Sequence, residues 1–356
     1  HLGPLPDIES LNEKLKIGIA GYGVVGKRRR GVIDDRDDMR TVAVCDRTLG
    51  GSGTFDDGVK YFRTYQELLG EDLDVLFVAM SNDIAAEVTV AGLENGLHVF
   101  CEKPPGRDVA DIERVIACHT SHAGQKLKYG FNHRYHDSVQ DALAALASGE
   151  LGDVIDMRGV YGKSQLITFD QTSWRTERAL AGGGVLLDQG IHMVDLIRLF
   201  GGEFTDVKSF VSNRVWGHDV EDNAYALMQT GDGVTAMLHS SASQWRHRFR
   251  LEIGMTRGAL TLSGILSGSK SYGAETLTVT RRGDNDMGDP HEETKSYDND
   301  PSWTLEVAEF ADAILRGGEI RNGSGEDALR TMQLVYKIYC ADPRWREMWN
   351  PEGVDA

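Results

Sequence analysis

The feature that most constrains the fold of this 356-residue chain is a glycine motif near its beginning. The apolar run Leu15–Ala20 leads directly into the motif, and a helix-like stretch follows it. In a GxGxxG motif the first glycine allows a tight turn, the second lets the backbone approach a pyrophosphate, and the third lets helix and strand pack closely. An acidic residue ends the next strand-like run about 20 residues further on, where it can accept from ribose hydroxyls. The sequence therefore predicts a Rossmann unit that binds a dinucleotide through Gly21, Gly23, Val24, Val25, Gly26 and Asp46.

The end of the second strand also bears on which dinucleotide is bound. A carboxylate at Asp46 would repel the 2′-phosphate of NADP, which favours NAD. Arg47 follows directly and could swing to bind that phosphate. We therefore expect NAD as the cofactor, with NADP as the open alternative.

Strand-like and helix-like patterns alternate over the first third of the chain. Apolar runs such as Asp74–Met80 and Leu97–Glu102 are separated by helical stretches, which is typical of βαβ units and a parallel sheet. Beyond Asn132, consecutive strands joined by glycine-containing turns indicate a largely antiparallel sheet. We expect an α/β protein with a Rossmann domain at residues 14–131 and a second α/β domain at residues 132–356. The polar stretch Arg282–Pro301 is expected to be an exposed loop.

Composition narrows the range of partners and compartments. The formal net charge of −17 repels phosphate backbones and anionic lipid surfaces, so neither nucleic acid nor a membrane is expected as a partner. No apolar run approaches the roughly 18 residues of a membrane span, and His1–Glu13 lacks the pattern of a signal peptide. The four cysteines are dispersed, which argues against a zinc site and a disulfide framework and for a reducing compartment. These features predict a cytoplasmic protein without a bound metal.

Further motifs lie at the end of the first domain and at the start of the second. Phe100–Pro104 contains Glu-Lys-Pro, Tyr129–Asn132 reads Tyr-Gly-Phe-Asn, and Trp174-Arg175 precedes three glycines and the block Asp188–Asp195. Together with the glycine motif, these runs resemble the Gfo/Idh/MocA family, named for glucose–fructose oxidoreductase and inositol dehydrogenase. The most specific match is that block, which has the family's DxGxHxxD pattern. The resemblance extends over nearly all of residues 16–339.

The resemblance implies a second domain with an open, mainly antiparallel sheet that often forms the oligomer interface, so we expect a homodimer or homotetramer. It implies hydride transfer between NAD(P) and a hydroxyl-bearing carbon of a sugar, cyclitol or nucleotide sugar. The histidine that relatives often carry near the cofactor is Ala85 here, which puts its contact in doubt. The expected catalytic residues are Lys103, Asp188 and His192, and the further cofactor contacts are Ser81, Asn82, Glu102, Lys103 and Asn132.

The chemistry of the catalytic candidates can also be argued from the residues themselves. Lys103 lies at the carboxyl end of a predicted parallel strand, where doubly wound sheets bind ligands, and a desolvated lysine can exchange a proton. Asp188, His192 and Asp195 share one helix face. Histidine suits proton transfer near neutral pH, and Asp188 could orient it or bind a substrate hydroxyl. The spacing alone would also fit a braced helix or a metal site, and Asp195 is given only a supporting role.

We expect hydride to leave an alcohol carbon as the hydroxyl proton passes to His192 or Lys103, and the residues do not decide between the two. One alternative is a non-catalytic, cofactor-sensing regulator of the same fold, against which the retention of all three candidates argues. Another is an enzyme that uses bound NAD for transient oxidation, with glycoside cleavage or epimerisation as the net reaction. This second alternative needs the same site.

Substrate specificity is expected to come from two further segments. Lys163, Trp174 and Arg175 lie in or beside the long loop before the glycine run, and could offer donors and a ring face to a sugar. In Ser243–Leu251, three arginines would share one face of a strand: Arg246, Arg248 and Arg250. Guanidinium groups suit the phosphates of a nucleotide sugar, but they also favour subunit interfaces. We prefer the interface interpretation.

Overall fold

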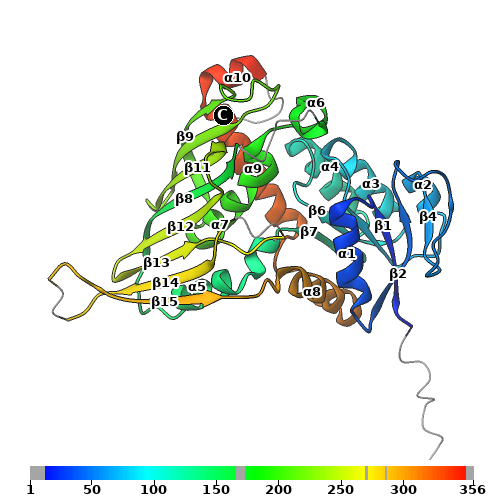
Figure 1. Ribbon diagram of the computed structural model, residues 1–356, viewed down its shortest axis with the longest axis horizontal. Coiled ribbons are helices and arrows are strands. Elements are labelled where there is room, and N and C mark those ends of the chain that lie inside the picture. The colour runs from blue at the N-terminus through cyan, green and yellow to red at the C-terminus, as the bar shows by residue number, and fades with distance from the viewer. Residues whose placement is uncertain (1–12, 166–172, 269–271, 285–286, 350–356) are drawn as a thin grey trace, which may run out of the picture.

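The computed structural model describes residues 13–165, 173–268, 272–284 and 287–349. Part of the predicted loop before the glycine run, residues 166–172, lies outside them. Two sheets lie side by side in the described residues, and the helix α9 (Gly325–Ala341) packs against strands of both (Figure 1). The molecule is therefore an α/β protein with two sheets joined through helices.

The first sheet is the predicted doubly wound one, with the strand order β3-β4-β2-β1-β5-β6-β7. All neighbouring strands are parallel except β3 and β4. Strands such as Val75–Val78 are apolar throughout and buried on both faces, as expected for a parallel sheet covered by helices. The strands are β1 (Leu15–Ala20), β2 (Met39–Cys45), β3 (Gly53–Thr54), β4 (Lys60–Phe62), β5 (Val75–Val78), β6 (His98–Glu102) and β7 (Leu127–Gly130).

Two helices of this half have local signals at their ends. The side chain of Asp108 accepts a hydrogen bond from the Asp111 amide and caps α4, and Gly96 follows α3 with a φ of +77°. The helices are α1 (Val24–Asp34), α2 (Tyr65–Leu68), α3 (Asn82–Glu94) and α4 (Val109–Thr120).

The second sheet has eight strands in the order β15-β14-β13-β12-β8-β11-β10-β9. Its neighbours are antiparallel except β8 and β11, which confirms the mainly antiparallel sheet. The strands are β8 (Val154–Ser164), β9 (Phe204–Ser212), β10 (Asn223–Thr230), β11 (Thr235–Gln244), β12 (Arg248–Met255), β13 (Gly258–Ser263), β14 (Glu275–Arg281) and β15 (His291–Tyr297). The helical segments are η2 (Asn132–Tyr135), α5 (Asp137–Ala147), η3 (Trp174–Thr176), α6 (Arg178–Ala181), η4 (Leu186–Gly190), α7 (Ile191–Gly201), α8 (Ser302–Arg316), α9 and α10 (Pro343–Trp349).

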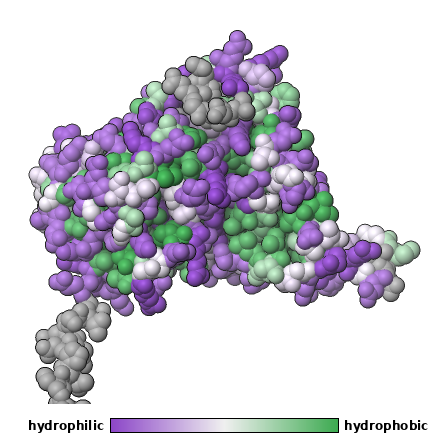
Figure 2. Space-filling view, turned by 180° about the vertical axis from the view of Figure 1, so that it is seen from behind, coloured by the Kyte–Doolittle hydropathy of each residue, from purple (hydrophilic) through white to green (hydrophobic). Residues whose placement is uncertain are grey.

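One face of the second sheet packs on α5, α7 and α9, and the other face is exposed. In β10, buried and exposed residues alternate, and Tyr225 and Leu227 are on the exposed side. Figure 2 shows a broad apolar area on the half of the molecule that contains this sheet. Exposed apolar faces of this kind often mark interaction surfaces.

The expected loop at Arg282–Pro301 is wrong in part, because it contains the strand β15. The strand pairs with β14 at the edge of the sheet, and all its residues but Tyr297 are exposed. An exposed edge strand needs no apolar alternation, and charged side chains protect its free edge from further pairing. The pattern that marks a half-buried strand was therefore missing from the sequence.

The helix α8 returns to the first sheet from late in the chain. Phe310 packs edge-on against Phe77 and Phe100, with ring centroids 6.0 and 5.6 Å apart. Arg29 of α1 lies 2.8 Å from Glu306 of α8, and both are buried. The division of the chain after residue 131 stays a prediction, since α8 completes the core of the first sheet.

Candidate active site

The glycine turn between β1 and α1 has the geometry that a pyrophosphate needs. Gly21 has a φ of +96°, and a Cβ there would lie 2.1 Å from the carbonyl oxygen of Ala79. A Cβ at Gly26 would lie 1.9 Å from the carbonyl oxygen of Gly21, so helix and turn touch. At Gly23 a Cβ would meet nothing within 4 Å, and Val24 is 87% exposed. The turn is therefore packed tightly beneath and open above, which fits a dinucleotide.

Asp46 is tied to this turn by hydrogen bonds. Its carboxylate accepts from the Tyr22 amide at 2.8 Å, from the Thr48 amide at 2.9 Å and from the Thr48 hydroxyl at 2.7 Å. Although partial burial acts in the opposite direction, these bonds lower the pKa of Asp46. The carboxylate is therefore charged beside the turn, where it would repel a 2′-phosphate, and the neighbouring Arg47 is exposed.

Lys103 follows β6 and reaches across to the second half of the molecule. Its Nζ donates a hydrogen bond to the main-chain oxygen of Asp188. Burial lowers the pKa of Lys103, and the nearby cations Lys163 and Arg175 lower it further, against the opposing effect of Asp188. The ammonium proton is thus held less firmly than in an exposed lysine.

Asp188 lies in the π-helical turn η4, immediately before α7. Turns of this kind occur often at functional sites. Its carboxylate lies 3.5 Å from Lys163 Nζ and 3.5 Å from Arg175 Nε. Burial alone would raise the pKa of Asp188, but the charges on Lys163, Lys103 and Arg175 hold it well below its usual value. Asp188 is therefore an anion surrounded by three cations.

The glycine run before η4 serves close packing. A Cβ at Gly184 would lie 2.1 Å from the carbonyl oxygen of Glu221, and one at Gly183 would lie 2.4 Å from the Tyr339 hydroxyl. The Glu221 carboxylate accepts from the Gly184 and Leu186 amides at 2.7 and 2.9 Å. These contacts hold the start of η4, and through it the position of Asp188.

His192 lies in the first turn of α7 with its ring almost buried. The ring stacks on His133, with centroids 3.7 Å apart and planes 9° apart, and the Phe131 ring meets it edge-on at 6.4 Å. Burial first, and then the charge on Lys103, holds the pKa of His192 well below its usual value. A neutral imidazole there can accept a proton.

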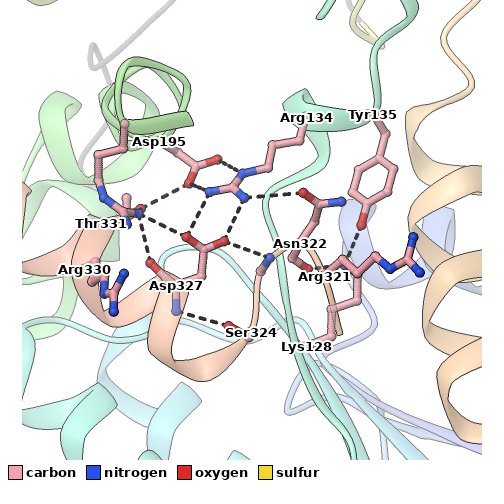
Figure 3. Close-up of polar contacts among 12 residues, drawn as sticks. Lys128, Arg134, Tyr135, Asp195, Arg321, Asn322, Ser324, Asp327, Arg330 and Thr331 are labelled. Carbon is pink, nitrogen blue, oxygen red and sulfur yellow. Dashed lines mark hydrogen bonds and ion pairs between the residues drawn. The ribbon is translucent and has the colours of Figure 1, made fainter. Parts of the chain in front are cut away.

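Asp195 points into a different environment from the other two residues of its motif. It accepts two hydrogen bonds from Arg134, at 2.7 and 2.6 Å, and one from Thr331 at 3.1 Å (Figure 3). Arg134 also pairs with Asp327 at 2.7 Å. This network joins α7 to η2 and α9, and it accounts for Asp195 without any part in the chemistry.

Several expected cofactor contacts have protein partners in the structure. Asn82 donates to the carbonyl oxygen of Ala181 at 2.8 Å, Glu102 pairs with Arg29, and Asn132 donates to the Ser302 hydroxyl at 3.0 Å. Ser81 stands at the N-cap of α3, after β5 and therefore at the same sheet edge as Lys103. Whether these residues also contact a cofactor stays a prediction.

Of the expected substrate residues, Lys163 and Arg175 meet at Asp188, while the Arg175 guanidinium lies 4.4 Å from the Trp174 ring centre. The arginine run lies elsewhere. Phe249 faces inward against Tyr161 and His133, so its neighbours Arg248 and Arg250 on β12 face the exposed side of the sheet. Arg246 precedes the strand in an exposed turn. Arg248 and Arg250 thus face away from the Asp188 cluster, and whether they meet a partner subunit or the phosphates of a nucleotide sugar stays a prediction.

Sequence reasoning missed the aromatic and polar side chains beside the cluster. Gln189 donates to the Tyr272 hydroxyl, His247 stacks on Tyr272 with centroids 4.6 Å apart, and the His133 ring covers His192. Tyr161 donates its hydroxyl proton toward His133 at 2.9 Å or accepts one from it. Gln189 and His247 stand within runs that the sequence analysis singled out for other residues, whereas His133, Tyr161 and Tyr272 stand in none. These contacts join positions far apart in the chain, which no spacing reveals.

Two absences hold within the described ranges. No helix there combines the length and apolar character needed to cross a membrane. In the same part of the chain, no group of three or more His, Cys, Asp or Glu side chains could hold a metal ion.

Comparisons with known proteins agree with this fold. Residues 15–131 match the model of an oxidoreductase family with an NAD-binding Rossmann fold, and residues 139–261 match the GFO/IDH/MocA C-terminal domain. The chain is similar to D-xylose 1-dehydrogenase (NADP(+)) 2 of Haloferax volcanii, with 27% identity over 91% of this chain and 95% of that one. It is also similar to inositol 2-dehydrogenase of Salmonella typhimurium, with 24% identity over 74% of this chain and 78% of that one.

Among solved structures, levoglucosan dehydrogenase in complex with NADH has the same fold. The TM-score is 0.80 at 19% identity, over 94% of this chain and 98% of that one. The two family models together span the whole first sheet and the strands β8 to β12 of the second, and the two relatives are dehydrogenases by name. This chain therefore belongs to the Gfo/Idh/MocA family of NAD(P)-dependent oxidoreductases.

Proposed function

We propose that this protein is a sugar or cyclitol dehydrogenase in which Lys103, Asp188 and His192 form the catalytic cluster. The observation that carries the proposal is the hydrogen bond from Lys103, at the end of β6, to the main chain of Asp188, four residues before His192. This bond joins the carboxyl edge of the first sheet, where the cofactor is expected, to the segment η4–α7, which contains the DxGxHxxD block. The names of the relatives support a sugar-like substrate, because they act on xylose and inositol.

The cofactor fits the edge formed by the carboxyl ends of β2, β1, β5 and β6. These strands are neighbours in the sheet, so the glycine turn, Asp46, Ser81 and Lys103 follow one another along that edge. When bound there, the nicotinamide supplies the carbon that accepts or donates the hydride. The charged Asp46 favours NAD over NADP, since the 2′-phosphate of NADP would lie beside the Asp46 carboxylate and be repelled by it.

Proton transfer and substrate binding are proposed for different residues of the cluster. Burial lowers the pKa of both Lys103 and His192, so each is less firmly protonated than its exposed counterpart, and we leave open which of the two takes the hydroxyl proton of the substrate. Asp188 stays ionised and can accept from a second hydroxyl. Lys163 and Arg175 hold Asp188 in place and can donate to further oxygens of a sugar.

The test is a screen of the wild-type protein with NAD and NADP against free sugars, inositols and nucleotide sugars, followed by the absorbance of reduced nicotinamide. We expect reduction with at least one sugar or cyclitol. Lys103→Ala should abolish turnover while NADH binding, measured by fluorescence, persists. Lys295→Ala, whose side chain on β15 is 66% exposed and pairs with Asp141 of α5 at 2.8 Å, is the matched control. Equal activity in both variants, or no reduction with any polyol, would contradict the proposal, and product without free NADH would indicate transient oxidation.

We also propose that the exposed face of the second sheet joins two copies of the chain, as a homodimer or as part of a homotetramer. Phe210 is 79% exposed on β9, and Tyr225, Leu227 and Met237 are about half exposed on β10 and β11. Tyr225→Lys should lower the mass in light scattering, whereas Met287→Lys, which is 99% exposed in the β14–β15 connection, should not. A wild-type monomer at high concentration would contradict this assembly.

A further inference from the structure

The two stacked imidazoles come from opposite sides of the cluster. His133 lies in η2, directly after the last strand of the first sheet, and His192 lies in the first turn of α7. The rings are nearly parallel at 3.7 Å, and both side chains are over nine-tenths buried. Two rings at this distance leave no room for water between them, so the orientation of one depends on the other.

Hydrogen bonds fix the protonation of His133. The Asn132 amide donates to the Ser302 hydroxyl at 3.0 Å, so its oxygen is the atom that faces His133 Nδ1, at 3.3 Å. An amide oxygen can only accept, and therefore Nδ1 carries the hydrogen. The other nitrogen, Nε2, is left to accept from the Tyr161 hydroxyl at 2.9 Å. The bonding capacity of a neutral His133 ring is thereby filled.

A second proton on His133 would conflict with its surroundings. Nε2 would then present a hydrogen to the Tyr161 hydroxyl and force it to turn, and a positive charge would be buried beside His136 and near Lys103. Burial, followed by His192, His136 and Lys103, holds the pKa of His133 well below its usual value. Geometry and charge thus agree on a ring that stays neutral.

His192 is in the opposite situation. Its Nδ1 is buried, and within the described residues it has no hydrogen-bond partner. What fixes the plane of this ring is the face of His133 and the edge of Phe131. The titratable groups around His192 are Lys103, His133, His136, Tyr161 through its bond to His133, and Asp188 one turn earlier.

We propose that His133 is a positioning residue for the reaction: it holds the His192 ring in place and, locked as the neutral Nδ1–H tautomer, leaves His192 as the only member of the pair that changes charge. This inference rests on the proposed function, since it needs His192 in the site. A neutral aromatic face beneath the ring also favours the imidazolium that forms when His192 accepts the substrate proton.

Three variants separate the two proposed roles of His133, which are to hold the His192 ring in place and to stay neutral itself. His133→Phe keeps a flat ring against His192, and we expect it to retain most of kcat. His133→Asn removes the ring, and we expect kcat to fall about tenfold or more, because the base is no longer oriented, with little change in the Michaelis constant for the cofactor. Tyr161→Phe keeps the stack but frees His133 Nε2 for a second proton, and should shift the acidic limb of the kcat–pH profile upward. Equal kcat and equal pH profiles in wild type and His133→Asn would overturn the proposal.

A spectroscopic measurement on the wild-type protein tests the tautomer without any substrate. In the wild-type protein with ring-¹⁵N histidine, assigned with His133→Phe and His192→Gln, His133 should show the Nδ1–H tautomer unchanged between pH 5 and 9. Titration of His133 within that range, or the Nε2–H tautomer, would refute the inference. If no sugar reduces the cofactor, the proposed function fails while this spectrum still reports on His133. If sugars are oxidised and His133 titrates, only the present inference fails.

Discussion

Two aspartates of one motif, Asp188 and Asp195, are surrounded by cations in opposite ways. Asp195 accepts paired hydrogen bonds from Arg134 at 2.7 and 2.6 Å and a third bond from Thr331. Asp188 has two cations at 3.5 Å, and the ammonium closest to it, Lys103, bonds to its main chain rather than to its carboxylate. The first arrangement is filled by the protein itself. The second holds its carboxylate at this longer distance, one cation to each oxygen, and this looser arrangement is the one that the proposed function uses.

Among the tests of this contrast between Asp188 and Asp195, we expect the largest effect on turnover, from a change at Asp188. Asp188→Asn keeps the shape but removes the charge that holds Lys163, Arg175 and a substrate hydroxyl. We expect kcat/KM to fall about 10²- to 10⁴-fold. The thermal midpoint should fall by less than in the matching variant of Asp195, because the two cations lie 3.5 Å from the Asp188 carboxylate, further than the 2.7 and 2.6 Å of the Arg134 bonds to Asp195. Steady-state kinetics and calorimetry on the same preparation measure both quantities. A variant that kept full activity would remove Asp188 from the site.

The matching change at the other aspartate should act on stability instead. Asp195→Asn removes one of the two carboxylates that pair with the buried Arg134. Asp327 remains at 2.7 Å, so we expect a loss of unfolding free energy of about 3 kcal/mol, at the low end of the range for a broken buried pair. The activity per folded molecule should stay near that of the wild type. Urea unfolding measures the first quantity, and active-site titration with NADH the second. Lost activity in a fully folded Asp195→Asn protein would break the comparison.

Because the pKa of Lys103 is lowered, replacing this residue should increase the stability of the folded protein by an amount that depends on pH. Below the folded-state pKa, the buried ammonium makes folding less favourable, and above the unfolded value of about 10.4 both states are neutral and this penalty is gone. Lys103→Met should therefore raise the thermal midpoint by about 2–4 °C at pH 7. The gain should shrink as the pH rises toward 10.4. A gain that grew with pH would reverse the sign of this argument.

The smallest kinetic effect is expected at Arg248, which faces away from the cluster. Arg248→Glu should leave the Michaelis constant for a free sugar and for a nucleotide sugar unchanged, while the mass in light scattering falls. Arg250→Glu is a second variant on the same face, but it would also break the ion pair of Arg250 with Glu252 at 2.8 Å. A higher Michaelis constant for nucleotide sugars alone would return the arginine run to the substrate site.

The parts that could be predicted from the sequence are those with local patterns. The glycine turn, the longer strands of the first sheet and the DxGxHxxD block each follow from consecutive residues, whereas the short strands β3 and β4 were not predicted. The edge strand β15 could not be found, because an exposed strand carries no apolar alternation. Nor could the stack of His133 on His192, since two positions so far apart meet only through the packing of η2 on α7. Roles that depend on one ring touching another need coordinates.

The return of α8 to the first sheet has a consequence for how the chain is made. Phe77 and Phe100 lie in strands synthesised early, yet Phe310, which covers them, leaves the ribosome some 200 residues later. Synthesis at about 5–20 residues per second leaves that apolar surface bare for about 10–40 s. The nascent first half is therefore a natural client for chaperones, and a ribosome-bound chain that ends before Ser302 should be captured by them more strongly than one that includes Arg316.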